Sequence, residues 1–238
     1  MFERPHHRRV HQVLQLLHTG FLEENHAFFG GGTCLALQIR EYRESVDVDF
    51  LCNHPAGYHR IHAAVFADGP AALCQPSVML AGELWRTRDA IRFFIDLQDG
   101  QRPVKCEVIR EGYLAPFSPG PRVAGVAALG PVDLMATKLL ANADRGMDPA
   151  LRFRDFFDLL VAGLEWPAHA PAAMTRAQTV YGQSARSAME KVAQLLRDHP
   201  DSRQEAYHRL AIHADSQTRI EEALTQPPQQ LVARIFGE

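Results

Sequence analysis

The first half of the chain mixes short apolar runs with segments whose apolar residues recur at helical spacing. The spacing i, i+3, i+4 predicts helices over residues 5–24, 34–40 and 58–66. Short apolar or alternating runs predict strands over residues 26–29, 46–51, 92–97 and 104–110. The turn residues Asp99 and Gly100 separate the last two strands, so we expect an antiparallel hairpin there.

The second half of the chain has a different pattern. Residues 116–121 are rich in proline and glycine, and no convincing strand pattern follows Pro131. Helical spacing continues over residues 132–143, 151–164, 171–197, 202–214 and 217–225. We therefore expect an α/β (α+β) protein, with a mixed sheet flanked by helices in residues 1–125 and a helical domain in residues 126–238.

Two acids stand out within the strand predicted at residues 46–51. The period-two alternation puts Val46, Val48 and Phe50 on one face and Asp47 and Asp49 on the other. Glu107 on the strand predicted at residues 104–110 can add a third carboxylate, and Asp96 is the rival for that position. Taken alone, such acids are typical of a solvated strand face.

A glycine turn changes the interpretation of these acids. Gly30, Gly31 and Gly32 follow an apolar strand, and Thr33 precedes a helical run. Backbone N–H groups at such a turn can approach a triphosphate, toward which the helix directs its positive end. The Thr33 hydroxyl can add a further bond. Together with the acid pair, the turn favours a site for an NTP and a divalent cation, Mg²⁺ or Mn²⁺, held by carboxylates.

Composition and charge narrow the class of protein. The 238 residues are 46% hydrophobic with a formal charge of −3, which excludes a disordered chain and a strongly basic protein that coats nucleic acid. No run of about 18 apolar residues or secretory signal is present, so we expect no membrane partner and a cytoplasmic location. The four cysteines form no C-x-x-C pair, and we expect them to be reduced and partly buried.

The motifs resemble those of a known superfamily. Gly31-Gly32-Thr33, then thirteen residues, then Asp47-Val48-Asp49-Phe50 is similar to the polymerase β-type nucleotidyltransferases. Residues 138–145 (KLLANADR) and 154–159 (RDFFDL) resemble two motifs of the AbiEii toxin branch, the nucleotidyltransferase toxins of bacterial toxin–antitoxin and phage-defence systems. The resemblance covers residues 28–164.

The resemblance implies roles for particular residues. It implies that Asp47 and Asp49 bind metal and that Lys138 and Asp155 belong to the catalytic or nucleotide-binding site. The residues add one independent point, because Lys138 lies mid-helix among leucines and needs an anionic partner unless it reaches water. Asp155 and Asp158, three residues apart, share one helix face.

The candidate site is assembled from these observations. The catalytic candidates are Asp47, Asp49, Glu107, Lys138 and Asp155, of which Asp47, Asp49 and Glu107 are the metal-ligand candidates. The nucleotide-binding candidates are Gly31, Gly32, Thr33, Lys138, Arg145, Arg154 and Asp158. Simpler interpretations exist: Lys138 as a surface lysine, Arg145 as a residue favoured at a helix end, and Arg154 with Asp155 as a surface ion pair.

The function expected from the sequence is metal-dependent transfer of a nucleotide from an NTP to an acceptor. The resemblance implies an RNA acceptor, a tRNA end in particular, and a toxin that has an antitoxin partner. The acceptor could equally be a protein hydroxyl or a small molecule, because composition does not choose between them. We expect the helical domain to close a cleft over the nucleotide. A catalytically silent nucleotide-binding or interaction module and a small-molecule transferase of the antibiotic-modifying kind remain the alternatives.

Overall fold

The computed structural model describes residues 2–237, which form two compact units. The first unit contains residues up to Glu41 and Ser45–Gly130, and the second contains Tyr42–Glu44 and Pro131 onward. The chain therefore enters the second unit for three residues before the acid pair. The boundary predicted between residues 125 and 126 falls between two paired strands of the first unit, β7 and β8.

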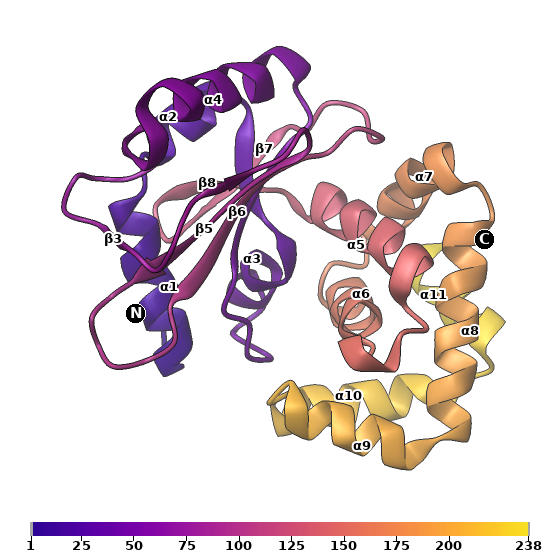
Figure 1. Cartoon of the computed structure of the whole chain (residues 1–238). Coiled ribbons are helices and arrows are strands. Elements are labelled where there is room, and N and C mark those ends of the chain that lie inside the picture. The colour runs from indigo at the N-terminus through magenta and orange to yellow at the C-terminus, as the bar shows by residue number, and fades with distance from the viewer. Residues whose placement is uncertain (1, 238) are drawn as a thin grey trace. The chain divides into compact units, whose positions relative to one another are not determined.

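The first unit is a mixed sheet with helices packed on it (Figure 1). Its helices are α1 (Pro5–Leu16), α2 (Thr19–Glu24), α3 (Gly31–Gln38) and α4 (Pro55–Asp68), with a short 3-10 turn at Gly69–Ala72. Its strands are β1 (Ala27–Gly30), β2 (Val48–Cys52), β3 (Met79–Leu80), β4 (Trp85–Arg86), β5 (Ala90–Asp96), β6 (Val104–Arg110), β7 (Pro119–Val123) and β8 (Val126–Leu129).

The sheet order is β3-β5-β6-β2-β1-β8-β7, and β4 also pairs with β5. Strand β2 carries Asp49 and begins one residue after Asp47, and strand β6 carries Glu107. Both lie in the middle of this order, where β2 pairs antiparallel with β1 and parallel with β6. The predicted β5–β6 hairpin is antiparallel, as expected. Central strands have neighbours on both sides, so their side chains are held in fixed register.

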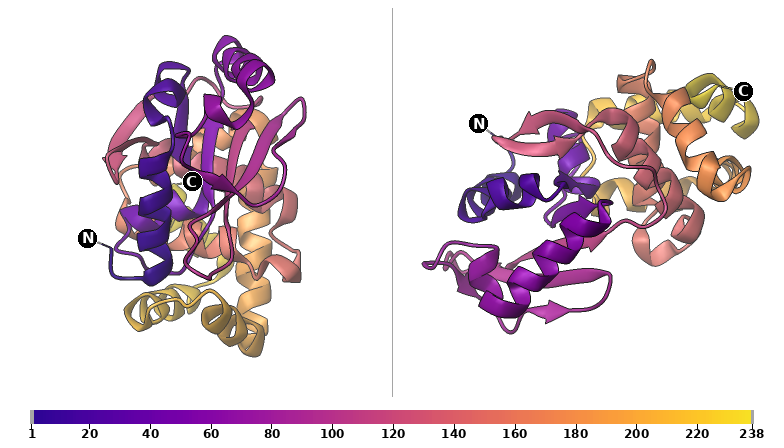
Figure 2. Two further views of the ribbon diagram at one scale, coloured as in Figure 1. Left: turned by 60° about the vertical axis from the view of Figure 1, so that its left-hand side comes forward. Right: turned by 90° about the horizontal axis from the view of Figure 1, so that it is seen from above.

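The second unit is helical (Figure 2). Its helices are α5 (Pro131–Arg145), α6 (Arg154–Glu165), α7 (Ala170–Tyr181), α8 (Ser184–Asp198), α9 (Pro200–Arg209), α10 (Ala214–Leu224) and α11 (Pro228–Phe236), with a 3-10 turn at Pro149–Leu151. Residues 155–163 of α6 are buried without interruption. A helix covered all round is a central helix, so its two aspartates must be paired inside the unit.

Several predicted boundaries differ from the structure. The helix expected over residues 5–24 is two helices, because Leu17 turns extended and bridges Cys74. The helix expected over residues 171–197 is interrupted at Gly182, whose φ is 53°. Strands β3, β4, β7 and β8 and helix α11 were not predicted. None of the helices in the described part of the chain is long and apolar enough to cross a membrane.

Candidate functional site

The glycine turn lies directly against Asp49. Gly30 pairs in register with Asp49 across β1 and β2, and α3 begins at Gly31, which has φ +70°. A Cβ atom on Gly31 would collide with the Asp49 carboxylate. Position 31 therefore requires glycine twice, for its positive φ and for its contact with the acid. The turn and the acid are one local structure, as the sequence suggested.

Thr33 is buried in this turn, and its hydroxyl donates a hydrogen bond to Ser45 Oγ at 2.8 Å. The two residues stand twelve positions apart, one in α3 and the other just before the acid strand. This bond fixes the loop that leads to Asp47 and Asp49. Ligand binding by the Thr33 hydroxyl stays a prediction.

The strand register decides between Glu107 and Asp96. Asp49 on β2 pairs with Glu107 on β6, so their side chains share one face of the sheet. Asp96 lies at the far end of β5, opposite Met79, and its carboxylate accepts the backbone N–H of Gln98 at 2.8 Å. Glu107 is therefore the acid that lies beside Asp49. Its function at that place stays a prediction.

Two cations hold the Glu107 carboxylate. Arg92 Nε lies 2.6 Å from Glu107 Oε1, and Lys105 Nζ lies 2.6 Å from Glu107 Oε2 and 3.4 Å from Asp47 Oδ2. Burial by itself would raise the pKa of Glu107, but these two cations hold that pKa below its usual value. Arg92 reaches Glu107 from the paired strand β5, whereas Lys105 lies two residues before Glu107 on β6 itself.

The acids meet part of the requirement for a metal site. Asp47 and Asp49 offer the hard carboxylate oxygens that Mg²⁺ and Mn²⁺ prefer. Within residues 2–237, no three His, Cys, Asp or Glu side chains gather closely enough to hold an ion by themselves. Mg²⁺ in NTP-dependent enzymes is commonly held by one or two carboxylates together with substrate phosphates. Asp47 and Asp49 fit that arrangement, and Glu107 would first have to leave its two cations.

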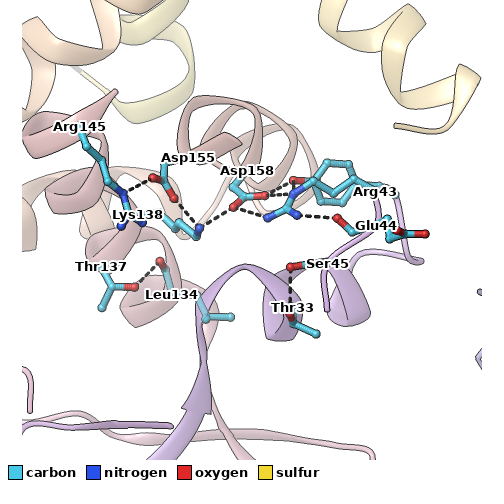
Figure 3. Close-up of polar contacts among 11 residues, drawn as sticks. Thr33, Arg43, Glu44, Ser45, Leu134, Thr137, Lys138, Arg145, Asp155 and Asp158 are labelled. Carbon is cyan, nitrogen blue, oxygen red and sulfur yellow. Dashed lines mark hydrogen bonds and ion pairs between the residues drawn. The ribbon is translucent and has the colours of Figure 1, made fainter. Parts of the chain in front are cut away.

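The second unit contains a buried charged network, which Figure 3 shows in close-up. Lys138, from the middle of α5, lies with its Nζ 2.6 Å from Asp155 Oδ1 and 2.6 Å from Asp158 Oδ2. Arg145 Nε, at the end of α5, lies 2.9 Å from Asp155 Oδ2. The surface-lysine interpretation is therefore wrong, because Lys138 is 6% exposed and paired with the two aspartates of the central helix.

Arg43 completes this network from the Tyr42–Glu44 segment. Its Nε lies 2.7 Å from Asp158 Oδ1, and its Nη2 donates to Asp158 Oδ2 at 2.9 Å. The Tyr42 hydroxyl also bonds Asp158 Oδ1. We call Arg43, Lys138, Arg145, Asp155 and Asp158 the buried network; all are buried except Arg145, whose side chain is 43% exposed. Sequence reasoning missed Arg43, because residues 40–45 looked like a polar break and no periodicity marks a single buried arginine.

The network shifts the acidity of its carboxyl groups. Burial by itself would raise the pKa values of Asp155 and Asp158. Lys138 and Arg145 around Asp155, and Arg43 and Lys138 around Asp158, outweigh burial and hold both pKa values below the usual range. Both groups are therefore ionised at neutral pH despite their burial.

Arg154 is not part of the buried network. It begins α6 and forms no hydrogen bond or ion pair with another side chain in the part of the chain that the structure describes. The alternative surface ion pair of Arg154 with Asp155 is wrong, since Asp155 is 2% exposed and bonds Lys138 and Arg145. Nucleotide binding by Arg154 stays a prediction.

The second unit also holds a cavity of about 480 Å³ between the 3-10 turn and helices α8 and α9. It is lined by Pro149, Ala150, Arg152, Phe153, Leu195, His199, Ser202, Glu205 and Ala206. None of the residues predicted to bind a nucleotide is among them. The cavity and the predicted nucleotide site therefore share no residue.

The four cysteines, Cys34, Cys52, Cys74 and Cys106, are free and buried, as expected. Burial raises the pKa of the Cys34 thiol to about 12, although this residue lies only two positions after Gly32. A thiol with such a pKa carries almost no thiolate at neutral pH. The cysteines thus pack as small core residues.

The fold of this chain is similar to that of a solved structure from another protein. The crystal structure of JHP933 from Helicobacter pylori superposes with a TM-score of 0.55 at 17% sequence identity, over 90% of this chain and 87% of that one. At this identity the likeness concerns the fold, a mixed sheet followed by a helical region. A search of curated proteins found no match.

A family comparison covers nearly the whole chain. Residues 16–233 match the family described as nucleotidyl transferase AbiEii toxin of a type IV toxin–antitoxin system. The match contains the glycine turn, the sheet acids and the buried network. The chain therefore belongs to the AbiEii nucleotidyl transferase toxin family of type IV toxin–antitoxin systems.

Proposed function

We propose that this protein transfers a nucleotide from an NTP to an acceptor hydroxyl, in a reaction that depends on Mg²⁺ or Mn²⁺. The observation that carries the proposal is the contact of Gly31 with Asp49 on the strand that pairs with Glu107. It joins a phosphate-binding turn to a row of carboxylates on one sheet face. Membership of a nucleotidyl transferase family supports the same activity.

In this proposal Asp47 and Asp49 hold the divalent cation. When bound, the cation neutralises charge that develops on the phosphate oxygens. The backbone N–H groups at Gly31 and Gly32 donate to the triphosphate, which the positive end of α3 also attracts. Lys138 and Arg145 attract the phosphates by their positive charge alone, because Lys138 stays paired with Asp155 and Asp158. Pyrophosphate is the leaving group.

Glu107 acts in this proposal as a carboxylate and not as the base that removes the acceptor proton. The two cations that bond it hold its pKa below the usual range, and a weak base is a poor proton acceptor at neutral pH. Its negative charge instead keeps Lys105 and Arg92 in place beside the acids.

The acceptor we propose is RNA, with a tRNA end as the first choice. The RNA acceptor rests on the resemblance of residues 138–145 and 154–159 to the toxin branch, and the family supports a toxin of a toxin–antitoxin system. We also propose an antitoxin that counteracts this protein in the cell. Co-expression tests that part: growth arrest by the toxin should be relieved by the product of a neighbouring gene, whereas no arrest on expression would contradict a toxin.

A transfer assay tests the activity directly. Purified protein receives labelled ATP, GTP, CTP or UTP with Mg²⁺ and total bacterial RNA. Asp49→Ala should lower transfer at least about 100-fold, the usual loss when a charge-stabilising group is removed from a reaction centre. The matched control is Asp96→Ala, an acid of the same sheet whose carboxylate only caps its own turn.

The possible results separate the candidate functions. Label in RNA from the unmutated protein and the Asp96→Ala variant alone would establish the transferase and name the nucleotide. Equal transfer by Asp49→Ala would contradict the assignment of the acid. No transfer, together with no thermal shift on adding Mg²⁺ and any NTP, would favour a silent interaction module.

A further inference from the structure

The two oxygens of Asp158 are shared between Arg43 and Lys138. Arg43 bonds both oxygens, at 2.7 and 2.9 Å, and Lys138 Nζ lies 2.6 Å from Oδ2. The side chains of Arg43 and Asp158 are 3% and 0% exposed. The aspartate is thus a rigid link between an arginine of the Tyr42–Glu44 segment and the lysine of α5 (Figure 3).

We propose that Arg43 is a positioning residue that sets both the place and the available charge of Lys138. Arg43 meets most of the charge of Asp158, so Lys138 is not required to neutralise that carboxylate alone. The inference rests on the proposed function, because there the task of Lys138 is to attract phosphate. Arg43 does not bond Lys138 itself but acts on it through Asp158, which both residues bond.

The charges of the buried network support this inference. Arg43, Lys138 and Arg145 carry three positive charges, and Asp155 and Asp158 carry two negative ones. Counted over these five residues alone, one positive charge is in excess. Without Arg43 the remaining charges balance, and Asp158 would draw the Lys138 ammonium to itself. A phosphate would then meet a neutral cluster.

The backbone keeps Arg43 in position. The His213 N–H donates to the Tyr42 carbonyl at 2.8 Å, and the Glu44 N–H donates to the Leu210 carbonyl at 2.9 Å. Arg43 Nη1 donates to the Glu44 carbonyl at 2.8 Å. Both flanking residues are tied to the second unit, so the guanidinium reaches Asp158 without having to be ordered by a ligand.

A second cluster of the same unit provides a matched control. Arg203 Nε lies 2.7 Å from Glu221 Oε1, to which the Tyr207 hydroxyl also donates at 3.0 Å. Like the Asp158 cluster, it joins an arginine, a carboxylate and a tyrosine. None of the three lysines of the chain, Lys105, Lys138 and Lys191, bonds Glu221 among the described contacts. Its loss should affect stability alone.

The experiment compares the unmutated protein with Arg43→Met, Arg43→Lys, Arg203→Met and the double variant Arg43→Met/Asp158→Asn. For each, KM for the NTP and kcat are measured in the transfer assay. Arg43→Met should raise KM about tenfold, because Lys138 would attract phosphate less, by about the strength of one charge-assisted hydrogen bond, with kcat within about twofold. The double variant, which restores the excess charge, should return KM to within about threefold of the unmutated value.

The two remaining variants sharpen the result. Arg43→Lys keeps the charge but loses the two-point bond, so its KM should lie between those of Arg43→Met and the unmutated protein. Arg203→Met should lower the melting temperature and leave KM unchanged. An unchanged KM in Arg43→Met, or an equal KM change in Arg203→Met, would overturn the inference.

A spectroscopic measurement tests the inference without depending on the transfer activity. In protein labelled with ¹⁵N at the lysine side chains, only three Nζ signals are present, and Lys→Arg variants assign them. Arg43→Met should move the Lys138 signal and leave that of Lys191, and the double variant should move it back. If the unmutated protein transfers no nucleotide, the proposed function fails. The Lys138 signal then decides by itself whether Arg43 positions Lys138. An unmoved Lys138 signal would then overturn the inference.

Discussion

Lys105 and Lys138 each bridge two carboxylates, but in different surroundings. Lys105 lies between Glu107 and Asp47 with 29% of its side chain exposed, whereas Lys138 lies between Asp155 and Asp158 with 7% exposed. Water can replace the contacts of an exposed ammonium at little cost, but it cannot reach a buried one. The sheet acids can therefore exchange Lys105 for another cation, while the buried network must stay intact.

This difference in exposure suits the two lysine–carboxylate clusters to different functions. Exchangeable acids suit a site at which a divalent cation and a nucleotide arrive and leave together. A fixed network suits residues that must keep one protonation state and one position through the reaction. Both clusters contain a carboxylate held by two cations, so the type of contact alone does not distinguish them.

The largest effect should follow from removing the shared aspartate of the buried network. Asp158→Ala removes the carboxylate that Arg43 and Lys138 share and leaves both cations buried. Breaking a buried ion pair in this way lowers the free energy of unfolding by about 3–5 kcal/mol. Glu107→Ala removes an acid whose side chain is only 8% exposed, but its partners Arg92 and Lys105, 47% and 29% exposed, can then be hydrated, so the loss should be about 1 kcal/mol or less. Urea unfolding measures both. Equal losses would refute the distinction between the two clusters.

Acid should destabilise the buried network through the same aspartates. The pKa values of Asp155 and Asp158 are lower in the folded protein than in the unfolded chain, where an Asp titrates near 3.8. The unfolded chain therefore takes up protons first, so the stabilisation is complete well above pH 4 and is lost as the pH falls through the folded values. Urea unfolding between pH 6 and pH 3 should show this decline.

The control for the acid effect is Asp158→Asn, which removes one of the two groups. Its unfolding free energy, lower at pH 7, should depend less on pH below 4 than that of the unmutated protein. A parallel pH dependence would show that groups outside the buried network cause the acid loss.

A smaller effect should follow from removing the exposed lysine. Lys105→Met takes away a positive charge beside Asp47 and Glu107, and like charges about 4 Å apart in water repel by about 1 kcal/mol. Mn²⁺ should therefore bind about fivefold more tightly, as measured by titration with electron paramagnetic resonance. Weaker Mn²⁺ binding would mean that Lys105 is required for the site and does not compete for it.

The smallest effect is expected at an exposed ion pair that belongs to neither cluster. Arg122 bonds both oxygens of Glu23 at 2.9 Å, but the two side chains are 58% and 36% exposed. Arg122→Ala should change the unfolding free energy by about 0.5 kcal/mol or less. Differential scanning calorimetry would reveal a larger loss, which would show that exposure is a poor guide to the strength of ion pairs in this protein.

The sequence predicted the elements whose signals are local. Only helix α3 separates the glycine turn from the strand that carries Asp49, and Glu107 lies on a strand whose apolar and polar residues alternate. The short strands β3 and β4 were missed because two residues cannot show a period. Strand β7 was missed because prolines at positions 119 and 121 are typical of a loop, and it pairs only with β8 at the end of the sheet order.

Spacing along the chain thus determined the glycine turn, the acid pair and the division into a sheet region and a helical region, because each depends on neighbours in sequence. Only the tertiary structure decided that Lys138 is buried between two aspartates and that Arg43 shares one of them. Arg43 and Asp158 stand 115 positions apart. Their pairing results from the packing of the Tyr42–Glu44 segment against α6, and no local pattern encodes a contact over that distance.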